Sequence, residues 1–153
     1  MWTEAFDLHS HSTNSDGEHP VADVAKMMAD SKVKFWSLTD HDTISGWLSA
    51  KFAAESEGMR FIPGVEITCM PGLKADSEVM EARQRDRASD SWHLLAYFPD
   101  MEFSSPQHEG FEAWLAPLGQ GRIPRMKTMV ERLGELGMPV DFDAVVARAG
   151  DSV

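Results

Sequence analysis

The feature that most constrains the fold is an alternation of short, mostly apolar runs with stretches of helical periodicity. The runs are predicted to be four strands, which cover Ala5–Leu8, Phe35–Leu38, Arg60–Thr68 and His93–Phe98. Between the first three, apolar residues recur every three or four positions, as in amphipathic helices. Strands that alternate with helices form a parallel sheet with covered faces. The sequence therefore predicts an α/β fold in which right-handed crossovers bring the carboxyl ends of the strands to one side.

Two of the predicted helices carry clear apolar stripes. The helix after the second strand is expected to be capped by Asp42 or Thr43, because both side chains can accept a backbone N–H. Its stripe consists of Ile44, Trp47, Leu48 and Phe52. A longer helix further along has a second stripe, which is expected to lie in the core and consists of Met126, Met129, Val130, Leu133 and Leu136.

One segment breaks the alternation. Residues 71–91 are highly charged and almost free of large apolar side chains, which predicts an exposed insertion. A chain of 153 residues is otherwise ordinary in length for a single domain, so one domain is expected over residues 1–153.

The net charge narrows the choice of partners. At −11, the chain is expected to repel phosphates, which argues against stable binding to duplex nucleic acid or to an anionic membrane. A small phosphorylated ligand held by bound cations remains compatible with this charge. No apolar run approaches the length that spans a bilayer. The single cysteine, Cys69, cannot form an internal disulfide, so a cytoplasmic location is expected.

Histidines and one carboxylate collect where the predicted strands end. His9 and His11 follow the first strand, and their spacing points both side chains to one face if strand geometry continues. His41 follows the second strand, and Glu66 lies late in the third. Sites in open α/β sheets and barrels form at the carboxyl ends of strands. His93 does not fit this simple geometry, because it enters its strand rather than leaves it.

Each histidine has an ordinary explanation when taken alone, since loop histidines are usually solvated. Glu66 is different, because a carboxylate buried in an apolar strand without a partner is costly. A metal cluster explains Glu66 and the histidines together, and such ligands suit zinc, manganese or iron. His19 and His108 fit no such position and are expected to be surface or capping residues.

The motifs resemble those of a known family. FDLHSHSTNSDGEHP, FWSLTDHDT, FIPGVEIT and HLLAYFPD, in this order, are similar to the PHP (polymerase and histidinol phosphatase) family. The resemblance is closer to the stand-alone phosphoesterases of the family, which act on nucleotides and short oligonucleotides, and it covers essentially the whole chain. It implies a distorted (β/α)7 TIM-like barrel, of which this chain would form the N-terminal part.

The resemblance also implies a role for each candidate ligand. His9 and His11 would hold one metal, and Glu66 would bridge this metal to a second one, held also by His93. Asp16 and His41 would hold a third. The implied cofactors are two to three divalent ions (Mn, Fe or Zn), and the implied reaction is phosphoester cleavage by a metal-bound hydroxide.

Four further residues are given supporting roles. Asp40 and Asp42 are expected to lie behind a ligating imidazole or to cap a helix. Arg122 and Arg125 begin a segment, GRIPRMKTMVERLGELGMPVDFDAV, that resembles the one after the fourth strand of these phosphoesterases. A guanidinium suits phosphate, so both arginines are candidate substrate-binding residues, although surface charges on an amphipathic helix explain them equally well.

Two segments of the family pattern do not occur in the sequence. These are a Gly-Arg-Pro-His and a later Asp-x-His, each of which would supply further ligands. We expect a fragment of a longer protein, the other interpretation being a truncated product with impaired metal binding. An open half barrel would expose apolar edges, which predicts aggregation or a need for partner strands.

Three functional hypotheses follow. The first is a metal-dependent phosphoesterase that hydrolyses nucleotide or short oligonucleotide phosphoesters. The second is an amidohydrolase-type metal hydrolase, which also begins with His-x-His after its first strand, although the S-D-G and T-D-H-D motifs favour the PHP family. The third is a non-catalytic PHP module. The oligomeric state is not predicted.

Overall fold

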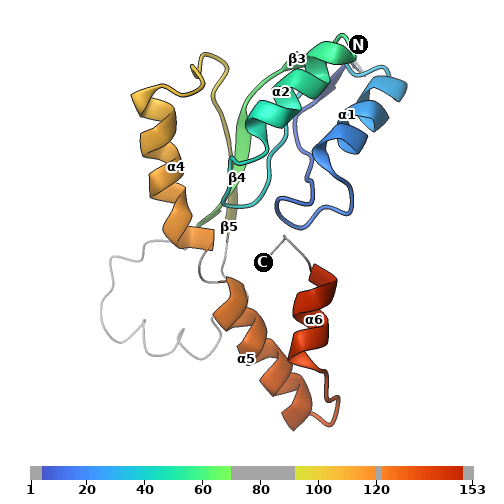
Figure 1. Ribbon diagram of the computed structural model, residues 1–153, viewed down its shortest axis with the longest axis vertical. Coiled ribbons are helices and arrows are strands. Elements are labelled where there is room, and N and C mark those ends of the chain that lie inside the picture. The colour runs from blue at the N-terminus through green and yellow to red at the C-terminus, as the bar shows by residue number, and fades with distance from the viewer. Residues whose placement is uncertain (1–4, 70–91, 120–121, 150–153) are drawn as a thin grey trace.

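The computed structural model describes residues 5–69, 92–119 and 122–149 (Figure 1). Its strands are β1 (Phe6–Asp7), β2 (Phe35–Trp36), β3 (Arg60–Phe61), β4 (Gly64–Cys69) and β5 (Trp92–Tyr97). Its helices are α1 (Val21–Asp30), α2 (Trp47–Ser56), α4 (Pro106–Gly119), α5 (Arg122–Glu135) and α6 (Phe142–Ala149). The mixed α/β class predicted from the sequence is confirmed. The predicted insertion at residues 71–91 lies outside the described residues.

The first three strands form a parallel sheet in the order β1-β2-β3. Helices α1 and α2 connect them and pack against the same face, because right-handed crossovers between consecutive neighbours all fall on one side. A buried cluster fills the space between these helices and the sheet. Its members include Val24, Ala25, Trp36, Leu38, Ala50 and Ala54.

The third predicted strand, Arg60–Thr68, is divided into two. Phe61 still pairs with β2, but the chain changes direction at Pro63, which has no N–H to donate to a neighbouring strand. β4 then runs beside the segment that follows β2, where His41 and Glu66 form a parallel bridge. Because of this break, Glu66 lies beside His41 in the polar segment that follows β2, and not beside β2 itself.

The prediction of an entirely parallel sheet is wrong for the last strand. β5 pairs antiparallel with β4, in a register that runs from Gly64 opposite Tyr97 to Cys69 opposite Trp92. A parallel partner would need a crossover back to the other end of β4, whereas an antiparallel partner starts where β4 ends.

A second buried cluster lies between α2, β4 and α4. Trp47 is at its centre, 1% exposed, and donates a hydrogen bond from Nε1 to the backbone oxygen of Gly64 at 2.6 Å. Leu115 of α4 and Val65 of β4 are buried beside it. The first residue of α2 thus attaches this helix directly to the strand that carries Glu66.

The predicted start of α2 is wrong. The helix begins at Trp47, with Gly46 at its N-cap, so neither Asp42 nor Thr43 caps it. The Asp42 carboxylate instead accepts hydrogen bonds from Thr68, and the Thr43 hydroxyl accepts the Ser45 N–H.

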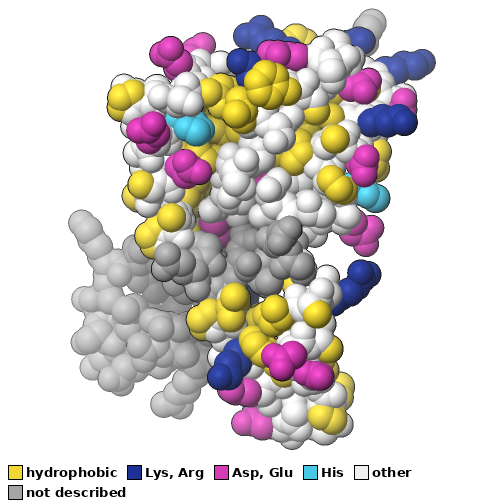
Figure 2. Space-filling model, in the orientation of Figure 1, with side chains coloured by type: hydrophobic (Ala, Val, Ile, Leu, Met, Phe, Trp, Pro, Cys, Tyr) yellow, Lys and Arg dark blue, Asp and Glu magenta, His cyan; other side chains and the backbone are white. Residues whose placement is uncertain are grey.

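The predicted apolar stripes are only partly buried. In α2, Leu48 and Phe52 are 51% and 61% exposed, because the helix packs through Trp47 and its alanines instead. In α5, Met129 and Leu136 are exposed and the other stripe residues are half-buried, so the predicted core role is wrong for the described structure. Apolar side chains accordingly appear on the surface over α5 and α6 (Figure 2).

Single residues mark the end of α5 and the start of α6. Gly137, at φ +78°, ends α5, and Asp141 caps α6 by accepting the Asp143 N–H at 2.9 Å. Within the described part of the chain, no helix is long and apolar enough to cross a membrane.

Candidate metal centre

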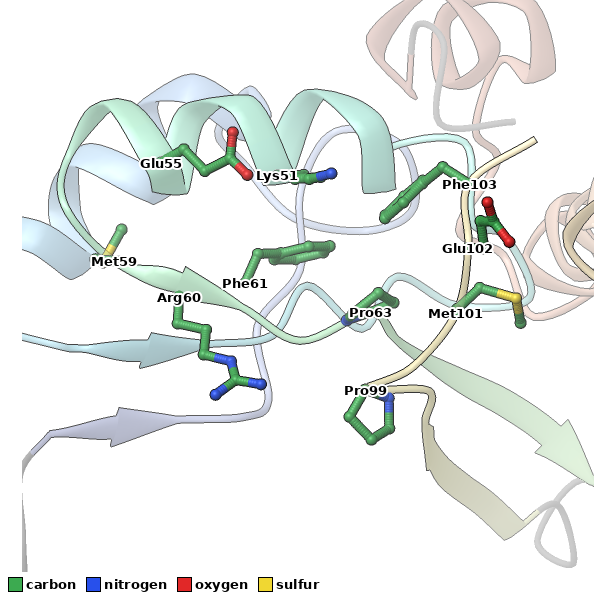
Figure 3. Close-up of a pocket in the computed structure, with 10 residues that line it drawn as sticks. All are labelled: Lys51, Glu55, Met59, Arg60, Phe61, Pro63, Pro99, Met101, Glu102 and Phe103. Atoms are coloured by element: carbon green, nitrogen blue, oxygen red, sulfur yellow. The ribbon is translucent and has the colours of Figure 1, made fainter. Parts of the chain in front are cut away.

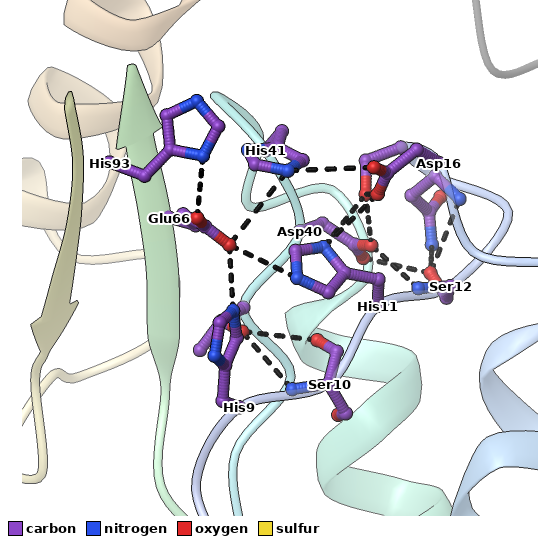
Figure 4. Close-up of polar contacts among 12 residues, drawn as sticks. His9, Ser10, His11, Ser12, Asp16, Asp40, His41, Glu66 and His93 are labelled. Atoms are coloured by element: carbon purple, nitrogen blue, oxygen red, sulfur yellow. Dashed lines mark hydrogen bonds and ion pairs between the residues drawn. The ribbon is translucent and has the colours of Figure 1, made fainter. Parts of the chain in front are cut away.

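The six predicted ligands lie together beyond the carboxyl end of the parallel sheet (Figure 4). They come from four segments: the chain after β1, the chain after β2, the middle of β4 and the start of β5. The residues are His9, His11, Asp16, His41, Glu66 and His93.

Glu66 is the centre of this cluster. Its side chain is 7% exposed, and Oε2 lies 2.8 Å from His9 Nε2, 3.1 Å from His11 Nε2 and 3.8 Å from His41 Nε2. The other oxygen, Oε1, lies 2.8 Å from His93 Nδ1. One buried carboxylate thus meets four imidazoles.

The antiparallel pairing of β5 explains the position of His93. Because β5 runs opposite to β4, its first residues lie beside the last residues of β4, and His93 is directly opposite Thr68. A histidine that enters its strand therefore reaches the same end of the sheet as histidines that leave theirs.

Asp16 extends the cluster on the side away from β4. Its Oδ1 lies 3.2 Å from His11 Nδ1, and its Oδ2 lies 3.5 Å from His41 Nε2. Three groups of donors result, each with its ligand atoms within 4.8 Å of one another: His9, His11 and Glu66; His11, Asp16 and His41; and His41, Glu66 and His93.

The ionisation of the cluster follows from its burial and charges. Burial alone would raise the pKa of Glu66, but the hydrogen bond with His9 and the charges of the neighbouring imidazoles outweigh it and lower that pKa. Burial lowers the pKa of His41, despite the opposing effect of the Glu66 and Asp16 carboxylates. At neutral pH the cluster thus combines an anionic carboxylate with an imidazole that favours its neutral form.

This donor set fits divalent cations. Neutral imidazoles and a carboxylate are ligands for zinc, manganese and iron. Among the described residues, the ion pairs of Glu66 are all with histidines, so no permanently charged side chain compensates its buried charge there. A bound cation would provide this compensation and would also use the converging nitrogen lone pairs.

Ser10, between the two first histidines, holds them in place and carried no signal in the sequence beyond its position. It is buried, its hydroxyl donates to the Ser37 backbone oxygen at 2.9 Å, and it accepts Trp36 Nε1–H at 2.8 Å. Ser10 faces the core while His9 and His11 both face Glu66, so the alternation of side chains expected of a strand continues past the end of β1.

The remaining candidates lie elsewhere. Arg125 is exposed on α5, the side chain of Arg122 is outside the described part, and no described ion pair joins Arg125 to the cluster. His19 is exposed. His108 is half-buried and packs its ring 5.9 Å from that of Trp47, so it is a packing residue rather than a capping one.

A separate cavity of about 570 Å³ lies between α2, β3 and residues 99–103 (Figure 3). It is lined mainly by apolar side chains such as Phe61 and Met101. Among its charged residues, Lys51 places Nζ 5.2 Å from the centre of the Phe103 ring. None of its lining residues belongs to the histidine cluster.

Comparison with known proteins gives consistent matches. Residues 7–140 match the PHP domain. The chain is 27% identical over 141 residues to a 3',5'-nucleoside bisphosphate phosphatase of Chromobacterium violaceum, covering 92% of this chain and 42% of that protein. It is 41% identical over 66 residues to a 5'-3' exoribonuclease of Haemophilus influenzae, covering 43% of this chain and 24% of that protein.

Solved structures agree with these matches. An amidohydrolase from Chromobacterium violaceum, with bound sulfate and no metal, superimposes with a TM-score of 0.72 at 26% identity. The match covers 95% of this chain and 43% of that structure. The chain thus spans less than half the length of these relatives.

Proposed function

The chain belongs to the PHP domain family, and from this premise we propose that it supplies metal-binding residues of a phosphoesterase that hydrolyses nucleotide or short oligonucleotide phosphoesters. The observation that carries the proposal is the contact of one buried carboxylate, Glu66, with four imidazoles. This arrangement has a clear chemical use when cations are bound.

We assign the residues to three ions. His9, His11 and Glu66 would hold the first, and Glu66 and His93 the second. Asp16 and His41 would hold the third, which is supported by the shorter distance from His41 Nε2 to Asp16 (3.5 Å) than to Glu66 (3.8 Å).

Bound divalent ions would acidify a water molecule, orient the phosphate and offset charge on the leaving oxygen. The protein residues provide the setting for this chemistry. Glu66 lies at the bottom of the cluster, whereas the side chains of His9, His93 and Asp16 are 51%, 43% and 67% exposed. The exposed rim leaves one side of the cluster accessible to a phosphate group.

The proposed barrel is supported by the sheet. Consecutive strands β1, β2 and β3 are neighbours, and both connecting helices lie on one face, as in a (β/α) barrel rather than a doubly wound sheet. The chain would then form the N-terminal part of a distorted (β/α)7 barrel.

A small substrate is supported by charge. The net charge of −11 disfavours an extended polyanion, whereas a mononucleotide, a nucleoside bisphosphate or a short RNA end meets mainly the cations of the site. The name of the Chromobacterium violaceum relative, a 3',5'-nucleoside bisphosphate phosphatase, makes such bisphosphates the first compounds to test.

The decisive variant is Glu66→Gln, which keeps the shape of the side chain but removes its charge. Because the carboxylate is proposed to serve two ions, the variant should lose more than one ion per chain. Manganese, iron and zinc are measured by elemental analysis, and phosphate release is assayed with a nucleoside 3',5'-bisphosphate, mononucleotides and a short RNA.

His108→Ala is the matched control, because His108 lies outside the cluster and its loss should leave the metal content unchanged. Full metal content in Glu66→Gln would contradict the assignment. A wild-type chain that takes up none of the three metals would contradict the proposed function itself.

An amidohydrolase is the second candidate, since the superimposed structure of 0.72 TM-score bears that name. Amide hydrolysis without phosphate release would favour it. Metal uptake without either activity would favour a non-catalytic module.

A further inference from the structure

We propose that Asp40 and Asp42, the residues on either side of His41, are positioning residues that fix the two halves of the metal cluster. This inference rests on the proposed metal-binding function. Each carboxylate binds a different ligand-bearing segment, so His41 sits between two anchored neighbours.

Asp40 binds the turn between His11 and Asp16. It is 2% exposed, and its Oδ1 accepts hydrogen bonds from the Ser12 N–H and the Ser15 hydroxyl, both at 2.7 Å. Its Oδ2 accepts the Ser12 hydroxyl at 2.8 Å. Hydrogen bonds to a buried carboxylate are among the stronger ones in proteins, so Asp40 anchors this turn to the segment that follows β2 (Figure 4).

Ser15 connects this anchor to two proposed ligands. Its hydroxyl oxygen lies 3.5 Å from His11 Nδ1 and 3.4 Å from Asp16 Oδ1. The turn itself is tightly packed, because a Cβ at Gly17 would lie 2.5 Å from the His11 backbone. A change at Asp40 is therefore transmitted to His11 and Asp16 rather than absorbed by the loop.

Asp42 binds the end of β4. Its Oδ1 accepts the Thr68 N–H at 2.7 Å, and its Oδ2 accepts the Thr68 hydroxyl at 2.8 Å. Thr68 follows Glu66 by two residues and lies directly opposite His93. Asp42 thus anchors the strand pair that carries the other half of the cluster.

The backbone of Asp42 supports this role. Its φ is +54°, in the left-handed region that side-chain-bearing residues seldom adopt. Such a conformation is retained where the surroundings enforce it. Here it is accompanied by the hydrogen bond from the Asp42 N–H to the Glu66 carbonyl at 3.0 Å and by both bonds to Thr68.

The two residues differ in how they tolerate an amide. The Ser12 hydroxyl already accepts the Asn14 N–H and the Asn14 side-chain amide, at 3.2 and 2.8 Å. In one orientation, the new amide nitrogen of Asp40→Asn would be a third donor to the Ser12 hydroxyl. In the other, it would face the Ser12 N–H, which then has no acceptor. One contact must therefore be lost in either orientation. In Asp42→Asn, the amide oxygen can keep the Thr68 N–H while the amide nitrogen donates to the hydroxyl. Asp42→Ala loses both contacts.

The experiment compares metal binding in these variants. Asp40→Asn should lower the affinity for the ion assigned to Asp16 and His41 by about 10- to 100-fold, as is typical when a residue that supports a metal ligand is lost. Asp42→Ala should lower the affinity for the ions assigned to Glu66 by a similar factor, and Asp42→Asn should restore that affinity. Ions per chain are counted by elemental analysis, and Co²⁺ titrations followed by visible absorption report which coordination spectrum is lost.

Ser15→Ala is a milder second variant that keeps the turn but removes the hydroxyl between Asp40, His11 and Asp16. Ser56→Ala is its control, because within the described ranges the Ser56 hydroxyl bonds only locally, to the Ala53 carbonyl at 2.8 Å at the end of α2. Weaker binding in Ser15→Ala alone supports the inference, even if Asp40→Asn fails to fold.

The outcomes separate the two proposals. If the wild type binds metal and Asp40→Asn, Asp42→Ala and Ser15→Ala all keep its stoichiometry and Co²⁺ spectrum, the positioning roles are wrong and the metal site stands. Equal losses in Asp42→Asn and Asp42→Ala would overturn the role assigned to the Asp42 contacts. A wild type that binds no metal overturns both proposals.

Discussion

Gly64→Ala is expected to destabilise the fold, because the structure leaves no room for a methyl group at the start of β4. A Cβ on Gly64 would lie 2.2 Å from Ser37 Oγ, 2.9 Å from Thr39 Cγ2 and 3.1 Å from Tyr97 Cδ1. Ser37 and Thr39 are fully buried, so neither side chain can move out into solvent. The clash must be relieved by shifting β4 or by forcing side chains out of their preferred rotamers.

The expected loss follows from two opposing effects. Overpacking a buried site costs about 1–3 kcal/mol. Replacing glycine by alanine also restricts the unfolded chain, which returns about 0.4–1 kcal/mol. A shift of β4 would in addition lengthen the bond from Trp47 Nε1 to the Gly64 carbonyl. We therefore expect the free energy of unfolding to fall by about 1–2 kcal/mol.

Urea unfolding followed by tryptophan fluorescence measures this change, since Trp36 and Trp47 are buried and report on the two core clusters. Gly134→Ala is the matched control. It lies within α5, nothing is within 4 Å of its Cβ position, and alanine is the better helix former by about 0.5–1 kcal/mol. A Gly64→Ala variant as stable as the wild type would refute the packing argument.

Two further predictions concern aromatic residues beside Gly64. Tyr97 is the sole tyrosine of the sequence. Burial, followed by the Glu66 and Asp7 carboxylates, raises its pKa above the ordinary value of 10.0. As the pH rises, the unfolded chain therefore ionises first, and the free energy of unfolding falls above about pH 10. The near-ultraviolet absorbance of tyrosinate measures the pKa of this side chain in the native and denatured states, and equal titration midpoints in the two states would contradict the prediction. Trp47→Phe should lower the free energy of unfolding by about 1–3 kcal/mol, because a buried carbonyl loses its donor, as thermal unfolding can show. Trp92→Phe, at a 69% exposed position, should have little effect.

The location of the candidate site could be predicted because its residues are tied to strand ends. His9, His11 and His41 lie shortly after runs that the sequence identifies as strands, and the carboxyl ends of parallel strands lie at the same edge of a sheet. Glu66 stood out because a carboxylate in an apolar strand requires a partner. The structure places all four in contact.

The pairing direction of β5 could not be predicted in the same way. An apolar run shows that a strand exists, but its direction depends on the connection, and the charged segment before it gave no periodicity to follow. The position of His93 contained the missing information. A histidine at the start of a strand can join ligands at the ends of other strands only if that strand runs antiparallel to its neighbour.

The helix errors have a different origin. A stripe of large apolar residues predicts a buried face, but α2 packs against α1 through Ala50 and Ala54, whose small side chains allow close approach. Leu48 and Phe52 are thereby turned outward. Likewise, Asp42 was a reasonable cap by residue type, yet two donors on Thr68 compete successfully for its carboxylate. Tertiary contacts outweighed local preference at both positions.

The same competition explains how a short segment can serve both fold and site. Residues 40–42 belong to the segment that follows β2, and they contact both the turn after β1 and the strand β4. If Asp42 capped α2, it could not hold Thr68, and the strand that carries Glu66 would lose an anchor beside the cluster. Gly46 therefore begins the helix without a side-chain cap. The weaker helix start leaves both carboxylates beside His41 available to position the histidines and Glu66.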